Sequence, residues 1–564
     1  MELPTSTPNN NDSSNTFSDI STTATKRKFI GLLTFIASLA IILIFLIPTL
    51  VMSNPYTPST SQFTFSVSGN TATITEITHG FSGETLTLPN YYNGRLVVGI
   101  DGLHGLSFDN VIIPSNIRTI SSNAFMYSTI GSITFAEESR LTTLGSRSFS
   151  NLAFTNIHLP ASLTSINSHA FANVETPFNV TFAPNSQITT GIGAAFNNTR
   201  LSSIEIPDSV TEFAASAFAN THDLTSITFS PNSQLMSVGA NVFSYSALTY
   251  IQFPGRTTSF AFSSLHDTLN PLAVTFAPDS QLSSIYNVTF SGARLSSIEI
   301  PASVTSIGNN AFRDMTTLTS LTFSPNSNLQ TIGGHAFENT NITSVIIPAS
   351  VATIGWSAFR NITTLTSLTF SPDSNLQTIG ELAFENTHIS GVIIPASVQT
   401  IVAGAFRNIT TLTSLTFSPN SNLQTIGAQA FWGTNIASVI IPASVQIIDF
   451  FAFANITTLT TVRFAQGSTL DATGANVFEG ANLTSLMLPN TITWLHFNAL
   501  AGIATTDFRI YFMGTEQQFN AIPGLNDSGL PQGARNNVVF FSEENVGGTW
   551  YFDDNGAPTL RPTA

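Results

Sequence analysis

The side chains that could carry out catalytic chemistry are few in this sequence and lie far apart. Nine histidines are scattered over 564 residues, and none forms the His-x-x-x-His or His-Glu-x-x-His spacing that places two metal ligands on one helix face. His222 and Asp223 are adjacent, but a single pair in a turn is typical of a solvated loop. Cysteine is absent, which excludes thiol catalysis, thiolate metal sites and a disulfide framework.

Phosphate and calcium chemistry are equally unsupported by the sequence. The segment IGNNAF at residues 307–312 recurs as a repeat turn and is not a glycine-rich phosphate loop, and DDNG at residues 553–556 lacks the spacing of a calcium loop. The formal charge is −15 with only 17 Lys and Arg, which argues against nucleic acid because phosphate contacts dominate that affinity. We therefore predict a protein that is not an enzyme, with no cofactor, no metal site and no nucleic-acid partner.

The elements that must position any functional residue come from one internal repeat. An apolar-x-apolar-Pro motif recurs with a first interval of 46 residues and then intervals of 47, and a second proline series with the same period lies between its members. The unit is therefore half the period, alternating 23 and 24 residues, which falls in the leucine-rich-repeat range. The first series is Pro114, Pro160, Pro207, Pro254, Pro301, Pro348, Pro395, Pro442 and Pro489, and the second is Pro184, Pro231, Pro278, Pro325, Pro372 and Pro419.

Each unit is predicted to contain one short strand and a bend. Residues 318–325 and 342–348 alternate apolar and polar side chains and are rich in β-branched types, as expected of strands. Residues 332–337 and 354–359 are expected to turn the chain back. Such a strand cannot bury a core alone, so we predict a mainly β solenoid of about 18 coils with one parallel sheet, whose coils bury each other's apolar faces.

Phenylalanine, with 46 copies, recurs at fixed positions in the bends. We predict two phenylalanine ladders inside the solenoid, one per coil type, with Leu265 and Leu500 as substitutes in the first. The first ladder is Phe125, Phe171, Phe218, Phe312, Phe359, Phe406 and Phe453, and the second is Phe149, Phe196, Phe243, Phe290, Phe337, Phe384, Phe431 and Phe478.

The repeat resembles a known family. The stretch SVTSIGNNAFRDMTTLTSLTFSPNSNLQTIGGHAFENTNITSVIIPAS at residues 303–350 is similar to the BspA-type leucine-rich repeat, and the resemblance covers about residues 62–545. Residues 63–100 resemble the N-terminal cap of that family and residues 510–522 the C-terminal end of many such arrays. The resemblance implies a surface-exposed bacterial or protist protein, often an adhesin that binds host matrix or other cells, and leaves the ligand open.

One residue of each predicted strand must point out of the sheet, between two buried neighbours. The N-terminal half presents polar groups there, including Glu205 and Glu299, which are four coils or about 19 Å apart and so too far for acid–base work at about 5–9.5 Å. Apolar residues alternate with threonine in the C-terminal half, which favours a partner site, although β-propensity and cross-strand contact within a ladder explain it too. The candidate ligand-binding residues are Ile346, Ile393, Ile440, Met487, Thr322, Thr369, Thr416 and Arg463.

The expected partner is an extracellular protein, which makes the chain a cell-surface adhesin. Two other functions remain open: a passive surface spacer or coat protein whose length is its function, and a glycan-recognition module acting through the Ser/Thr/Asn surface. Sequons recur at Asn361, Asn408 and Asn455, with others at Asn341 and Asn482, and would be glycosylated only in a eukaryotic host.

An uncharged apolar run precedes the repeat. Residues 29–52 are long enough to cross a bilayer, and Lys26-Arg27-Lys28 before them puts the N-terminus in the cytoplasm. We predict a single-pass membrane protein with an extracellular repeat domain; the alternative is secretion after signal cleavage. The predicted segments are a disordered cytoplasmic tail (1–28), a transmembrane signal anchor (29–52), a linker (53–62), an N-terminal cap (63–102), the leucine-rich-repeat solenoid (103–513) and a C-terminal cap and tail (514–564).

Overall fold

The repeat-bearing part of the chain is described by a computed structural model. It covers residues 59–77, 82–189, 192–261, 263–286, 290, 292–496, 498–503, 508–525, 528, 537–540, 548–552 and 558–562. The chain divides into two compact units, residues 1–56 and residues 57–564, and the described residues all belong to the second. The predicted membrane segment at residues 29–52 therefore lies outside the described residues. Among those that are described, no helix combines the length and hydropathy needed to span a bilayer.

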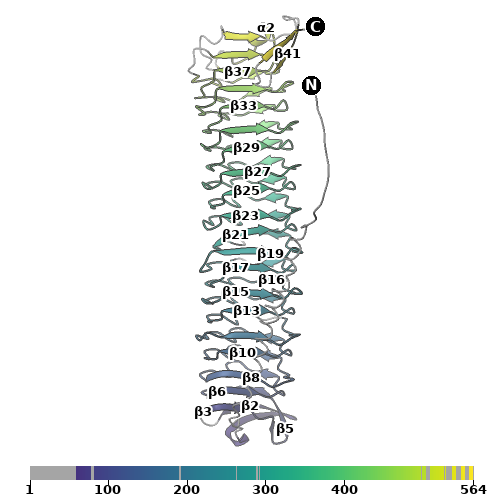
Figure 1. Cartoon of the computed structure of the whole chain (residues 1–564), viewed down its shortest axis with the longest axis vertical. Coiled ribbons are helices and arrows are strands. Elements are labelled where there is room, and N and C mark those ends of the chain that lie inside the picture. The colour runs from purple at the N-terminus through teal and green to yellow at the C-terminus, as the bar shows by residue number, and fades with distance from the viewer. Residues whose placement is uncertain are drawn as a thin grey trace, which may run out of the picture. The chain divides into compact units, whose positions relative to one another are not determined.

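Long strands from successive coils stack side by side, as the arrows in Figure 1 show. Wherever two of them are hydrogen-bonded they run parallel, with like positions in register, as in β25 and β27. The described residues form a mainly β solenoid of about 19 turns, which confirms the predicted fold class. The long strands are β3 (Ser82–Thr87), β6 (Ser107–Ile113), β8 (Thr129–Phe135), β10 (Asn156–Leu159), β12 (Asn179–Phe182), β13 (Ser203–Ile206), β15 (Ser226–Phe229), β17 (Tyr250–Phe253), β19 (Leu272–Phe276), β21 (Leu295–Ile300), β23 (Ser320–Phe323), β25 (Ser344–Ile347), β27 (Ser367–Phe370), β29 (Gly391–Ile394), β31 (Ser414–Phe417), β33 (Ser438–Ile441), β35 (Thr461–Phe464), β37 (Ser485–Leu488) and β39 (Arg509–Phe512).

A second parallel ladder of two-residue strands runs along the coils, and the sequence interpretation missed it. It occupies the start of the segments that were expected only to bend, such as Thr353–Ile354. The second residue of each short strand, usually isoleucine, is buried in the core, and the first residue, usually serine or threonine, is more exposed. The short strands are β7 (Thr119–Ile120), β9 (Thr143–Leu144), β11 (Ser165–Ile166), β14 (Glu212–Phe213), β16 (Ser237–Val238), β18 (Ser259–Phe260), β20 (Ser284–Ile285), β22 (Ser306–Ile307), β24 (Thr331–Ile332), β26 (Thr353–Ile354), β28 (Thr378–Ile379), β30 (Thr400–Ile401), β32 (Thr425–Ile426), β34 (Ile447–Ile448), β36 (Ala472–Thr473) and β38 (Trp494–Leu495).

The two phenylalanine series form one stack, which corrects the prediction of two ladders. Phe359 belongs to one series and its neighbours Phe337 and Phe384 to the other, with ring centroids 5.2 and 5.3 Å away and nearly parallel planes. Because the two coil types alternate along the stack, rings from the two series must alternate as well. All three rings are fully buried, so the predicted core role is confirmed.

The turn that carries each core phenylalanine is held by two residues with left-handed backbone. Around Phe359 these are Ser357 and Asn361, with φ of 52° and 61°. Asparagine tolerates this conformation better than most residues, and its amide nitrogen donates to the same position in the preceding coil. The Asn361 amide nitrogen donates to the Asn339 side-chain oxygen at 3.1 Å, and the Asn386 amide nitrogen donates to the Asn361 oxygen at 2.8 Å.

Antiparallel pairing occurs near the two ends of the repeat. At the N-terminal end, η1 (Thr60–Gln62) leads into β1 (Phe63–Ser68), which pairs with β2 (Thr71–Ile77), and β4 (Tyr91–Tyr92) pairs with β5 (Arg95–Ile100). Strand β2 then pairs in parallel with β5 and so joins the short-strand ladder. At the other end are α2 (Glu516–Asn520), which starts with a Thr515 capping box, β40 (Val538–Phe540) and a hairpin of β41 (Gly548–Phe552) and β42 (Pro558–Pro562).

Candidate functional site

The outward column of the long strands holds the predicted binding residues, and we call its C-terminal part the isoleucine stripe. Ile346, Ile393 and Ile440 are 63%, 63% and 56% exposed, while the strand residues on either side of each are buried. Each isoleucine lies opposite the next coil's residue in register: Ile346 opposite Thr369, Ile393 opposite Thr416 and Ile440 opposite Arg463. The members of the stripe are Thr322, Ile346, Thr369, Ile393, Thr416, Ile440 and Arg463.

Met487 continues the same register but does not belong to the exposed surface. Its side chain is only 3% exposed, so the expectation of a fourth exposed apolar residue is wrong. Met487 lies opposite Tyr511 of β39 in the strand register. The stripe therefore ends at Arg463, which is partly exposed.

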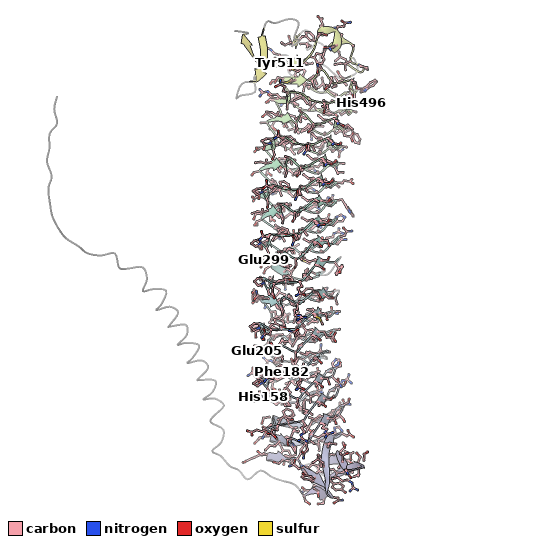
Figure 2. All side chains as sticks on the ribbon, turned by 90° about the vertical axis from the view of Figure 1, so that its right-hand side faces the viewer. His158, Phe182, Glu205, Glu299, His496 and Tyr511 are labelled. Atoms are coloured by element: carbon pink, nitrogen blue, oxygen red, sulfur yellow. The ribbon has the colours of Figure 1, made fainter. Side chains whose placement is uncertain are left out.

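The N-terminal part of the same column is polar, as expected, and offers no paired acid and base. Figure 2 shows His158, Glu205 and Glu299 along one side of the stack, with Glu205 and Glu299 well separated along it. His158 shares a 2.9 Å hydrogen bond with the Thr181 hydroxyl, and partial burial lowers the pKa of the imidazole. In Glu299 the carboxylate accepts a 2.8 Å bond from the Ser324 hydroxyl.

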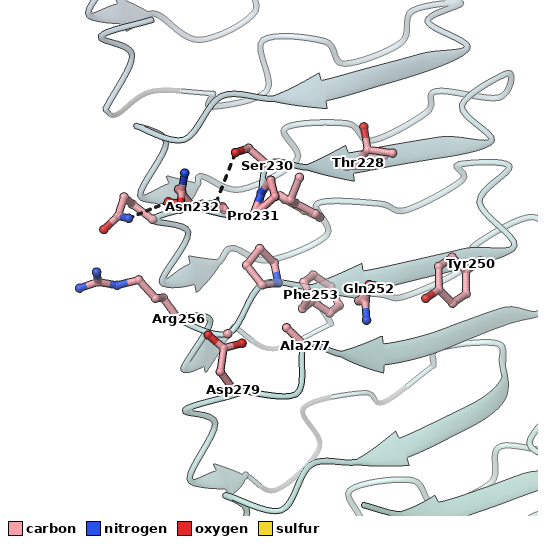
Figure 3. A pocket seen from close by; sticks show the side chains of 16 residues that line it. Thr228, Ser230, Pro231, Asn232, Tyr250, Gln252, Phe253, Arg256, Ala277 and Asp279 are labelled. Atoms are coloured by element: carbon pink, nitrogen blue, oxygen red, sulfur yellow. Dashed lines mark hydrogen bonds between the residues drawn. The ribbon is translucent and has the colours of Figure 1, made fainter. Parts of the chain in front are cut away.

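Grooves interrupt the long-strand face at a regular interval. One of about 660 Å³ lies between β27 and β29, and its equivalent of about 540 Å³ lies one period later, between β31 and β33. Ile393 lines the first and Ile440 the second, so the stripe residues form part of the groove walls. The same position in the N-terminal half holds a groove of about 470 Å³ with Tyr250 and Gln252 in place of glycine and isoleucine, and with Arg256 and Asp279 at its other end (Figure 3).

The grooves lie where two successive long strands are not hydrogen-bonded to each other, as between β15 and β17, β27 and β29, and β31 and β33. Hydrogen-bonded pairs such as β25 with β27 and β29 with β31 are followed by strands that are not paired with them, although the short-strand ladder is continuous from β20 to β38. Near β27 and β29 the last backbone bond before the gap joins the His388 nitrogen to the Leu365 oxygen at 3.0 Å. Beyond it the strands separate toward Pro372 and Pro395, which opens a wedge lined by Ser371 and Ser397.

A column of mostly charged side chains lies on the turns, and the sequence had not predicted it. Each member directly follows a core phenylalanine, and neighbouring members are in contact across coils, so we call the column the turn ladder. Its signal in the sequence is the recurrence of arginine and of glutamate at intervals of 47 residues. The turn ladder consists of Arg313, Glu338, Arg360, Glu385, Arg407 and Trp432.

Ion pairs connect the turn ladder from one coil to the next. Arg313 Nε lies 2.9 Å from Glu338 Oε2, and Arg360 Nη1 lies 3.6 Å from Glu338 Oε1. Glu338 Oε2 is buried and accepts no hydrogen bond, so its contact with Arg313 is an ion pair without hydrogen-bond geometry. By contrast, Arg360 Nε donates a 2.6 Å hydrogen bond to Glu385, whose other oxygen is 3.8 Å from Arg407 Nε.

Neither region has the geometry of an active site. In the part of the chain that the structure describes, no three His, Asp or Glu side chains gather to hold a metal ion. His335 Nδ1 lies 2.8 Å from Glu338 Oε2, but this carboxylate is almost fully buried and also contacts two arginines. The arrangement is suited to holding a surface, and the isoleucine stripe with its grooves is the best-defined surface for a ligand.

Comparison with known proteins agrees with this geometry. The description "BspA type leucine rich repeat region" matches residues 101–193, 142–270, 283–413 and 377–505, with six copies. The chain belongs to the BspA-type leucine-rich-repeat family. Proteins of this bacterial surface-type family are typically non-enzymatic binding scaffolds. A search of curated proteins finds none that matches this BspA-type protein.

Several solved structures are similar to this BspA-type protein. A leucine-rich-repeat protein from Bacteroides ovatus is 20% identical, with a TM-score of 0.45 over 80% of this chain and 98% of that one. A leucine-rich cell-surface protein from Faecalibacterium prausnitzii is also 20% identical, with a TM-score of 0.24 over 73% and 96%. The pneumococcal vaccine antigen PcpA is 15% identical, with a TM-score of 0.26 over 85% and 97%.

Proposed function

We propose that this protein is a non-enzymatic cell-surface adhesin that binds an extracellular protein through the isoleucine stripe and the grooves beside it. The proposal rests on one observation: three isoleucines, each more than half exposed, lie in one column two coils apart. Exposed aliphatic residues aligned on one face are typical of protein–protein contact, since their burial on binding is favourable. The proposed location outside the cell depends on residues 29–52 acting as a membrane anchor or, alternatively, as a cleaved signal.

The grooves beside the isoleucine stripe provide concave sites that a partner side chain can enter. A partner side chain that enters the wedge between β27 and β29 would contact Ile393 on the β29 wall and Ser371 and Pro372 on the β27 wall. An apolar anchor surrounded by polar groups is the arrangement found at the centre of many protein interfaces. Because the groove recurs one period later beside Ile440, a partner could use two equivalent sites at once.

The test is a triple variant, Ile346→Thr, Ile393→Thr and Ile440→Thr. Threonine keeps the branched side chain that suits a strand, so the fold should be retained while most of the apolar area is removed. We expect capture on immobilised fibronectin, laminin or collagen to weaken at least about tenfold, which corresponds to about 1.4 kcal/mol. The matched control is Ile447→Thr, because Ile447 is also an exposed isoleucine, 49% accessible, but lies on the short-strand ladder.

Three outcomes would contradict the proposal. Binding of the triple variant at wild-type strength would show that the stripe does not contact the partner. The high β-propensity of isoleucine would then explain why it occurs at these positions. An equal loss in the Ile447→Thr control would indicate a nonspecific effect. Absence of saturable binding by the wild-type protein to any of these matrix proteins, or to host cells, would favour a passive spacer.

A further inference from the structure

We infer that the turn ladder and the exposed ring of Trp356 beside it form a second binding site, which takes a neutral, extended polysaccharide lying along the stack. The site uses different residues from the isoleucine stripe and does not depend on the proposed function. It is carried by four features: fixed planar polar groups, an exposed aromatic face, balanced charge and the spacing of the coils.

The polar groups of the turn ladder are held in place before any ligand arrives. The side chains of Glu338 and Glu385 are only 3% and 6% exposed, whereas those of Arg313, Arg360 and Arg407 are 43%, 34% and 34% exposed. Each buried carboxylate therefore fixes the arginines on both sides of it and leaves part of each guanidinium in contact with solvent. Binding to groups that are already ordered avoids much of the entropy cost of immobilising long side chains.

A second column of planar groups lies one residue further along each turn. Asn339 donates a 2.6 Å bond to Asp314, Asn361 donates to Asn339, and Asn386 donates to Asn361. Amide and guanidinium groups side by side present several donors and acceptors in fixed directions. Sugars, with a hydroxyl on most ring carbons, are the ligands that can use such a dense and regular set.

Trp356 supplies the apolar face that a sugar ring needs. Its side chain is 53% exposed, and its indole lies over Gly334 in the space that a Cβ atom there would occupy. The His335 ring contacts the indole edge-on, with ring centroids 3.9 Å apart. The indole is thus held on one side and open on the other, and an aromatic face of this kind packs against the C–H face of a pyranose ring.

The far end of the turn ladder offers a second aromatic ring. Arg407 lies over the ring of Trp432, 5.1 Å from the guanidinium carbon to the ring centroid. This contact fixes the arginine through cation–π attraction. Trp356 lies in the coil of Arg360 and Trp432 three coils later, so Glu385 and Arg407 lie in the coils between the two aromatic rings.

The charge of the site favours a neutral ligand over a polyanion. Three arginines are offset by Glu338, Glu385 and Asp314, so the column carries no large net charge. The chain as a whole carries −15, which repels polyanions at long range. A sulfated or uronate-rich chain would thus meet little electrostatic attraction here.

The repeat distance suits a chain with a two-residue period. Like members of the turn ladder recur every second coil, a separation of about 10 Å at the usual strand spacing. An extended β-1,4-linked glycan also repeats every second sugar, over a similar length, because successive rings are flipped. Successive pairs of sugars could then meet equivalent arginines and amides.

The experiment follows the intrinsic fluorescence of the full-length protein during titration with cellohexaose and with chitohexaose. Only four tryptophans are present, so a ligand on Trp356 should alter the emission measurably. We expect saturable binding to at least one of these oligosaccharides. Trp356→Ala should weaken it at least about tenfold, the factor that loss of about 1.4 kcal/mol produces, and Arg360→Lys should weaken it as well, because lysine lacks the planar fork.

The chain contains a matched control for the aromatic ring. Phe450 occupies the position of Trp356 four coils later and is 48% exposed, but the residue equivalent to Arg360 there is Ala454. Phe450→Ala should leave the affinity unchanged within about twofold. If Trp356→Ala fails to fold by thermal unfolding, Arg360→Lys and the wild-type titration still decide the question.

Several results would overturn the inference. One is the absence of any saturable change in wild-type fluorescence and in calorimetry with both oligosaccharides. Another is an equal loss of binding in the Phe450→Ala control. Binding to heparin alone, abolished by raised salt, would assign the site to a polyanion instead.

Discussion

Whether a side chain in this protein is buried or exposed depends mainly on its position in the coil. Alternate strand positions explain why Val345 and Ile347 are buried while Ile346 between them is exposed. The same logic explains the core phenylalanines, which were correctly assigned to the interior from their recurrence alone. It failed at Met487, which lies opposite Tyr511 of the next coil and is only 3% exposed, because burial of an outward residue depends on packing between coils.

At this scale we predict that Phe359→Ala costs about 3–5 kcal/mol, the usual range for truncation of a buried phenylalanine. The ring is fully buried and stacked on both sides, so the cavity cannot close without disturbing Phe337 and Phe384. Thermal unfolding measures the loss. The control is Phe370→Ala, since Phe370 is only partly buried and should cost less. Equal melting temperatures for the Phe359→Ala variant and the wild type would show that the ring is not part of the core.

Hydrogen bonds in the turns differ among the sequon asparagines and affect how accessible their amide nitrogens are to glycosylation. Asn341, Asn361 and Asn482 are sequon asparagines whose amide nitrogens donate to the preceding coil, at 2.6, 3.1 and 2.8 Å. Asn408 and Asn455 occupy the same turn position as Asn361, yet they make no side-chain hydrogen bond within the described residues. An amide nitrogen that already donates a hydrogen bond to a neighbouring coil is less accessible to a modifying enzyme.

We therefore predict unequal glycosylation if the repeat domain is secreted from a mammalian cell. Occupancy at Asn408 and Asn455 should exceed that at Asn341, Asn361 and Asn482, as measured by mass spectrometry of the glycopeptides. Converting Asn339 to Ala removes the acceptor of the Asn361 amide and should raise occupancy at Asn361. Equal occupancy at all five sites would show that the hydrogen bonds do not protect these side chains.

Alternation of two coil types organises the whole repeat. It sets the period of the grooves, the spacing of the isoleucines and the sign of each charge in the turn ladder. Deleting a complete two-coil unit, residues 349–395, would place Arg407 beside Glu338 and so preserve the order of the charges. Deleting the single coil at residues 349–372 would instead place Glu385 beside Glu338, and both carboxylates would be buried without the arginine that separates them.

The prediction is that the two deletions differ in stability. The two-coil deletion should melt close to the wild type, because each coil is stabilised mainly by its neighbours. The single-coil deletion should be destabilised by about 3–5 kcal/mol, the cost of breaking a buried ion pair by removing one partner, here Arg360. Circular dichroism against temperature distinguishes them. A further variant, the single-coil deletion with Glu385→Gln, should recover part of the loss.

Periodicity by itself determined the fold class, the unit length, the buried phenylalanines and the outward column, because each coil meets the same environment as the coil before it. Only the tertiary structure decided the short-strand ladder, the pairing of long strands that opens the grooves, the burial of Met487 and the joining of the turn charges into one ladder. These features depend on how closely adjacent coils approach each other at each side of the stack. Spacing along a chain places residues in the same column, but contact distances determine whether they pair, separate or shield one another.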